Sequence, residues 1–143
     1  MKKEVKIALV MLGIILLLGI IGGIFFYLNQ KNYELNLPQQ EELSSIIIKS
    51  NTNSTEVIDS EEINDIIYAL SESGNGRTTK EKSIQDYPVN SDNILQVDFI
   101  FKESGASRLF VYMKNDNYYL EQPYNGIYRI SGDEYNSIEK FIR

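Results

Sequence analysis

The strongest feature of the hydrophobic pattern is an unbroken apolar run from Ile7 to Leu28, which contains no charged residue, Asn, Gln, Ser, Thr or Pro. As a helix this run would extend about 33 Å, enough to cross a hydrocarbon core of about 30 Å. The run ends in bulky residues, Phe25 to Leu28, where a cleaved secretory signal would carry small ones. The pattern therefore predicts a transmembrane helix over residues 7–28 and favours an uncleaved anchor over a cleaved signal.

The residues that flank the run indicate its orientation. Lys2, Lys3 and Lys6 precede it, whereas the residues that follow are mixed in charge. The positive-inside rule then predicts a cytoplasmic stub at residues 1–6 and a C-terminal domain on the outer side of the cell membrane. Residues 29–40 are mostly polar and contain Pro38, so they are expected to form a linker in front of a domain at residues 41–143.

Within that domain the pattern changes several times. A β-branched cluster at residues 42–49 predicts a strand, and Asn51 to Ser54 predicts a turn. Asp59 is expected to cap a helix, because Glu62 follows three residues later and an apolar stripe with helical spacing comes next. This stripe ends before Gly74, and its members are Ile63, Ile66, Ile67 and Leu70.

From Ile94 onward apolar residues recur at every second position, which indicates strands. Turn residues separate four such segments, at 94–101, 109–113, 118–122 and 127–130. Ser131 and Glu134 then match a capping box that opens a terminal helix. The order β-α-β-β-β-β-α predicts an α+β fold: a small antiparallel sheet with two helices on one face, preceded by one transmembrane helix.

Composition narrows the chemistry of the domain. Residues 1–30 hold three Lys and one Glu, so 11 of the 14 cationic and 19 of the 20 acidic side chains, a net charge of −8, fall in residues 31–143. This charge argues against nucleic acid as a partner. The chain has no His and no Cys, which rules out His- or Cys-based catalytic triads and zinc sites with those ligands. We expect no catalytic residue, cofactor or metal site.

Carboxylates leave one enzymatic alternative. Asp86, Asp98 and Glu121 could supply an acid pair of the kind that glycoside hydrolases use, but nothing in the sequence brings two of them together. Their structural interpretations are a turn acceptor for Asp86, a solvent-facing strand position for Asp98 and a cross-strand partner for Glu121. We therefore do not expect an enzyme.

Tyrosine is unusually frequent, with ten in the chain. Strand tyrosines commonly cover a sheet as half-buried residues, whereas exposed ones can bind a peptide or a sugar, because they combine a large rigid area with a polar tip. Tyr124 stands out because it lies in a turn between Pro123 and Gly126, which we expect to fix the backbone. The candidate recognition surface is Tyr87, Tyr118, Glu121, Gln122 and Tyr124.

Two segments also carry a resemblance to a known family. They are the T-x-K-x-x-S-x-x-D-Y-P stretch from Thr78 to Pro88 and the E-Q-P-Y-x-G-I-Y block from Glu121 to Tyr128. Over roughly residues 43–143 the chain resembles a domain-of-unknown-function family of membrane-anchored proteins and lipoproteins from Gram-positive bacteria. That family has no established activity, so the resemblance implies localisation and domain extent only.

Together these patterns predict a single-pass membrane protein whose outer domain binds an envelope protein or peptide. The alternative is a structural accessory subunit without a ligand, and a carboxylate hydrolase is the third.

Overall fold

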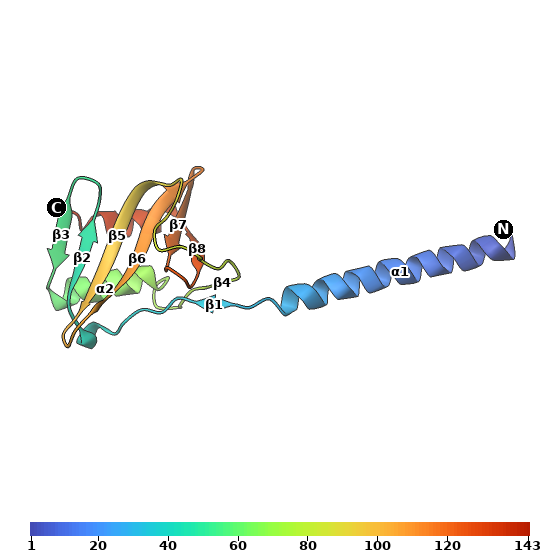
Figure 1. The fold of residues 1–143 in the computed structure, drawn as a ribbon, viewed down its shortest axis with the longest axis horizontal. Coiled ribbons are helices and arrows are strands. Elements are labelled where there is room, and N and C mark those ends of the chain that lie inside the picture. The colour runs from blue at the N-terminus through green and yellow to red at the C-terminus, as the bar shows by residue number, and fades with distance from the viewer. The chain divides into compact units, whose positions relative to one another are not determined.

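The computed structural model describes all of residues 1–143 and divides into two compact units, residues 1–31 and residues 32–143 (Figure 1). The first unit contains α1 (Lys3–Leu28), a helix that includes the whole predicted span. Its most apolar window has a mean hydropathy of 2.9, which makes α1 long and apolar enough to cross a membrane. A signal sequence near an N-terminus can have the same length and apolar composition.

The second unit is built on a six-stranded antiparallel sheet in the order β3-β2-β5-β6-β7-β8 (Figure 1). The strands are β2 (Leu43–Lys49), β3 (Ser54–Val57), β5 (Asp92–Phe101), β6 (Ala106–Lys114), β7 (Asn117–Glu121) and β8 (Ile127–Ile130). Two helices, α2 (Ser60–Leu70) and α3 (Gly132–Glu139), pack against each other and share one hydrophobic core with the sheet. The predicted α+β class, with both helices on one face, is confirmed.

Strand register explains which side chains enter the core. Val97 of β5 lies opposite Ile48 of β2 and Leu109 of β6, and all three are fully buried. Opposed residues in an antiparallel pair point to the same face, so the alternating apolar positions form one continuous layer beneath the helices. The intervening positions, among them Asp98, Tyr112 and Glu121, face the other side of the sheet, which we call the outer face.

Side-chain caps begin both helices where the sequence predicted them. Asp59 Oδ1 accepts hydrogen bonds from the backbone N–H groups of Glu61 and Glu62, each at 3.0 Å. Ser131 and Glu134 form the reciprocal capping box of α3, with distances of 3.1 and 2.6 Å. These local contacts satisfy N–H groups that the helices leave without intrahelical partners.

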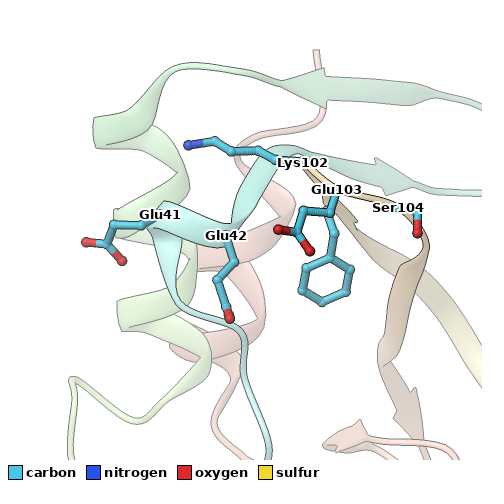
Figure 2. A pocket seen from close by; sticks show the side chains of 6 residues that line it. Glu41, Glu42, Lys102, Glu103 and Ser104 are labelled. Carbon is cyan, nitrogen blue, oxygen red and sulfur yellow. The ribbon is translucent and has the colours of Figure 1, made fainter.

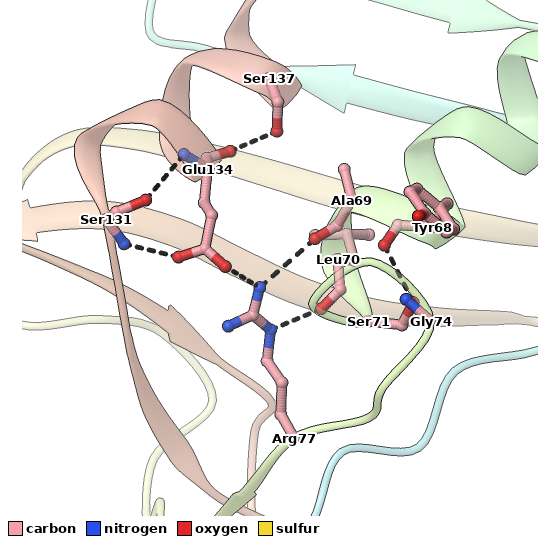
Figure 3. Close-up of polar contacts among 9 residues, drawn as sticks. All are labelled: Tyr68, Ala69, Leu70, Ser71, Gly74, Arg77, Ser131, Glu134 and Ser137. Atoms are coloured by element: carbon pink, nitrogen blue, oxygen red, sulfur yellow. Dashed lines mark hydrogen bonds and ion pairs between the residues drawn. The ribbon is translucent and has the colours of Figure 1, made fainter.

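Arg77 connects the end of α2 to the start of α3 (Figure 3). Its Nε donates to the Leu70 carbonyl at 2.6 Å, and one terminal nitrogen donates to the Ala69 carbonyl at 3.3 Å and to Glu134 Oε1 at 2.7 Å. The Arg77 side chain is almost fully buried. No local pattern in the sequence indicates this connection between the helices.

The structure differs from the sequence-based expectation at the predicted linker. Tyr33–Glu34 forms β1, which pairs with β4 (Thr78–Thr79), and η1, a short 3-10 helix at Gln40–Glu42, leads into β2. Leu35 and Leu37 pack against the core. The compact unit therefore begins at Asn32 rather than at residue 41. Leu35 and Leu37, spaced two apart, form a short apolar face, and the polar residues around them made this segment resemble a linker.

The sheet also gains a strand at its edge. β3 follows the turn predicted at residues 51–54, and its sequence Ser-Thr-Glu-Val has one buried apolar residue, Val57. An edge strand needs few apolar residues, because only one face is covered and one neighbour supplies its hydrogen bonds. This is why composition alone did not indicate it.

Candidate functional site

Residues 80–91, which we call the strap, run across the outer face of β6 and β7 (Figure 1). The strap is joined to the turn before β8, where Ser83 N donates to the Asn125 carbonyl at 3.1 Å and Ile127 N donates to the Glu81 carbonyl at 3.0 Å. Tyr87 packs edge-on against Phe110 of β6, with 5.1 Å between the ring centroids. Phe110 and Tyr112 are buried on the outer face, so this part of the sheet is not open to solvent.

A buried carboxylate fastens the strap to the sheet. Glu121 of β7 is 1% exposed and accepts hydrogen bonds from Ser83 Oγ at 2.6 Å, Tyr112 Oη at 2.9 Å and Gln85 Nε2 at 3.1 Å. All three of these donors are uncharged side chains. Neutral donors thus replace the water that the carboxylate would otherwise bind, which makes this cluster costly to disrupt.

Electrostatics keep the tyrosine in this cluster neutral. Burial and then the hydrogen bond to Glu121 raise the pKa of Tyr112 well above its ordinary value of 10.0. A neutral phenol donates a hydrogen bond to Glu121, whereas a phenolate would repel the carboxylate. Ser83 is 0% exposed, so its hydroxyl is not accessible to a substrate and acts here as a donor. The cluster holds the strap in place.

The strap reverses the usual distribution of polar and apolar side chains. Its polar residues Ser83 and Gln85 point toward Glu121, while Ile84, Tyr87 and Val89 are 79%, 48% and 53% exposed. Single exposed apolar residues are ordinary, but here three gather on one short segment. The strap therefore presents apolar side chains to solvent beside the residues that fasten it to the sheet.

The predicted recognition surface does not form as a unit. Tyr118 lies on the helix side of the sheet, where its ring packs 5.0 Å from that of Tyr135, and Glu121 is buried beneath the strap on the outer face. Gln122 is half-buried and is used to bind the backbone of Asn36. Side chains that alternate along a strand point to opposite faces, so residues close in sequence need not share one surface. Tyr87 and Tyr124 are the exposed members.

The carboxylates proposed for the hydrolase alternative are likewise separated. Asp98 occupies the outer face as expected, but it is 5% exposed rather than solvated and binds Arg108 Nε at 2.5 Å and Gln96 Nε2 at 2.8 Å. Burial alone would raise the pKa of Asp98, but the hydrogen bonds from Arg108 and Gln96 outweigh burial and lower it. Asp86 is exposed on the strap. Asp98 and Glu121 are each bound by partners of their own.

A cavity of about 500 Å³ lies away from the strap, between η1 and the turn that joins β5 to β6 (Figure 2). Phe101 and Glu103 both line this cavity, and Figure 2 shows Lys102 extending away from the Glu103 carboxylate. An aromatic ring bordered by a carboxylate can hold a cationic side chain. Glu42 also lines this cavity, but its Oε2 accepts a hydrogen bond from the Gln39 backbone N–H at 3.0 Å, so part of this carboxylate already stabilises the fold. No three carboxylates here or elsewhere lie close enough to hold a metal ion.

The comparison with known families decides what this domain is related to. The family model DUF5301, described as a domain of unknown function (DUF5300), matches residues 31–129. The chain belongs to this family. The match confirms the resemblance to a domain-of-unknown-function family and includes the E-Q-P-Y-x-G-I-Y block. No curated protein and no solved structure matches the chain.

The extent of the family match agrees with where the compact unit begins. The match starts at residue 31, close to Asn32, and so includes the segment that we expected to be a linker. It ends at residue 129, before α3, although Tyr135 and Ile138 of α3 belong to the core. The DUF5301 domain of this chain is therefore completed by a C-terminal helix.

Proposed function

We propose that this DUF5301 protein is a single-pass membrane protein whose residues 32–143 lie outside the cytoplasm and bind a protein or peptide of the cell envelope through the strap. The exposed apolar side chains of Ile84, Tyr87 and Val89 carry this proposal. Exposed apolar clusters on a soluble domain commonly mark an interaction surface, and a rigid backbone lowers the entropy lost on binding.

The orientation rests on charge at the two ends of α1. Lys2, Lys3 and Lys6 stand at its N-terminal end, which supports a cytoplasmic N-terminus. Protease added to intact bacterial protoplasts that express the chain should then digest residues 32–143. Protection of this region until the membrane is permeabilised would contradict the orientation and leave the strap proposal to be tested on the other side.

The binding surface is tested by crosslinking in intact envelopes, comparing partner capture by the parent with that by Val89→Asp and Tyr87→Ala. Truncating an anchoring aromatic commonly costs about 2 kcal/mol of binding, which is about a 30-fold loss of affinity. Tyr68→Ala is the matched control, since Tyr68 is 57% exposed on α2. Capture that is equal in all four proteins, each with an unchanged melting temperature, would contradict the strap proposal and favour an accessory subunit without a ligand.

A further inference from the structure

The turn before β8 holds an exposed tyrosine in a backbone conformation that tyrosine rarely adopts. Asn125 N donates to the Gln122 carbonyl at 3.0 Å, which closes a four-residue turn with Pro123 at its second position and Tyr124, at φ 59°, at its third. Gly and Asn adopt a positive φ more readily than Tyr does. Tyr124 is nevertheless 65% exposed, so packing within the domain does not account for a large aromatic residue at this position.

The same turn is fixed to the N-terminal segment of the domain. Asn125 Nδ2 donates to the Glu34 carbonyl at 2.6 Å, and Gln122 exchanges two hydrogen bonds with the Asn36 backbone, at 2.7 and 3.0 Å. Tyr128 Oη donates to the Tyr33 carbonyl at 3.1 Å. The turn that carries Tyr124 is therefore fixed to residues 33–36, the first part of the domain.

Very little chain separates that point from the apolar helix. α1 ends at Leu28 and the first residue bound to the domain strands is Tyr33, so only Asn29 to Asn32 lie between them. Five residue steps of at most about 3.5 Å span about 17 Å even when fully extended. The headgroup layer on one side of a bilayer accounts for about 5–8 Å of this distance.

We propose that Tyr124 contacts the lipid headgroups of the membrane that α1 spans. This inference rests on the membrane placement of α1 proposed above. Tyrosine favours the membrane interface, because its ring is apolar and its hydroxyl is polar. A connection of four residues limits how far the Tyr124 turn can lie from that interface.

Charge near the turn indicates which lipids suffice. Lys82 lies opposite Gly126, and Lys31 and Lys80 are close in sequence to the paired residues Tyr33 and Thr79, but Glu34 and Glu81 lie among these three cations, and residues 31–143 carry a net charge of −8. These charges provide no basic patch of the kind that recruits anionic lipid. The contact therefore depends on the aromatic ring and forms equally on zwitterionic and on anionic bilayers.

The chain contains no Trp, so one introduced Trp is an unambiguous fluorescent probe. The full chain carrying Tyr124→Trp is reconstituted into phosphatidylcholine vesicles that contain a lipid with a nitroxide on its headgroup, and Tyr68→Trp is the control at a similarly exposed position. We expect the nitroxide lipid to quench the fluorescence of Tyr124→Trp several-fold more strongly than that of Tyr68→Trp. Adding phosphatidylglycerol should not change this ratio.

Three outcomes would overturn the inference. Equal quenching of the two variants would show that Tyr124 is not at the interface. Quenching of Tyr124→Trp that disappears as protein is diluted in lipid would assign the contact to a second copy of the chain, and quenching that requires phosphatidylglycerol would assign it to anionic lipid. Extraction at alkaline pH tests separately whether α1 spans the membrane. A chain whose α1 is not inserted is released from the vesicles, whereas an inserted chain stays with them even if Tyr124 does not contact the lipid.

Discussion

Replacing Arg77 by Met tests whether one buried cation couples the two helices. The substitution keeps most of the apolar volume of the side chain but removes three hydrogen bonds, to the Leu70 and Ala69 carbonyls and to Glu134. The Leu70 bond, at 2.6 Å, is the shortest of the three, whereas the Ala69 carbonyl also accepts from Glu72 N at 3.4 Å. We therefore expect most of the loss at Leu70 and Glu134.

The magnitude follows from burial of the partners. A hydrogen bond from a charged donor contributes about 1.5–3 kcal/mol, and the Glu134 side chain, 29% exposed, regains part of its share from water. Arg77→Met should accordingly lower the free energy of unfolding by about 3 kcal/mol. Glu134→Gln should cost only about 1 kcal/mol, because it leaves both α2 carbonyls bound to Arg77.

The measurement is urea unfolding of residues 32–143, followed by circular dichroism. Arg129→Met is the matched control, because it removes the same charge from an exposed side chain whose hydrogen bond is to Asn117. This control should lie within about 0.5 kcal/mol of the parent. An Arg77→Met protein as stable as the control would refute the conclusion that Arg77 holds α2 and α3 together.

Acid adds a second readout of the same contact. Burial would raise the pKa of Glu134, but the Ser131 backbone N–H and the Arg77 guanidinium outweigh burial and lower it below the ordinary value of 4.5. A carboxyl with a lowered folded-state pKa stabilises the protein above its unfolded pKa and loses this contribution as the pH falls through the folded pKa. The stability difference between parent and Arg77→Met should therefore shrink as the pH falls below about 4.5. A constant difference would show that the ion pair contributes nothing.

Three further perturbations test other parts of the domain. Gly126→Ala should cost about 1–3 kcal/mol, because a Cβ would lie 2.7 Å from both Thr79 Cγ2 and Tyr128 Oη, and adding Thr79→Ser should recover part of the loss in a thermal melt. Residues 41–143 should be about 2–4 kcal/mol less stable to urea than residues 32–143, because they lack Leu35, Leu37 and the hydrogen bonds between Asn36 and Gln122. Equal stabilities would show that residues 32–40 are a linker that contributes nothing to the fold. Asp98→Asn should reduce stability at neutral pH and flatten its decline in acid, since the pKa of Asp98 is lowered in the fold, and an unchanged acid profile would contradict this assignment.

Gly126 is structurally important, as the sequence indicated, but for a different physical reason. We expected it to supply a backbone shape that other residues avoid, but its φ is not in the left-handed region, and the residue with positive φ in that turn is Tyr124. Glycine is required because Thr79 and Tyr128 approach its Cα closely. Sequence marks such a position as special, but only the neighbours from other elements tell why.

The sequence by itself determined the features that depend on a few consecutive residues. The apolar run, the caps at Asp59 and Ser131, and the period of two in β5 to β8 act over one helical turn or one strand, so their physical cause lies within a short window. They sufficed for the α+β class and for both helices. They also placed Asp98 on the face opposite the helices.

Tertiary structure alone decided the contacts that join distant parts of the chain. The docking of residues 33–37, the link from Arg77 to Glu134 and the fastening of Ser83 to Glu121 join residues 38 or more positions apart. Each of these contacts depends on which groups face each other once the sheet has formed, and local sequence preferences do not encode this. The same cause scattered the predicted tyrosine surface: Tyr118 faces the core and Tyr87 faces solvent, because side-chain direction is set by register and by the path of the strap.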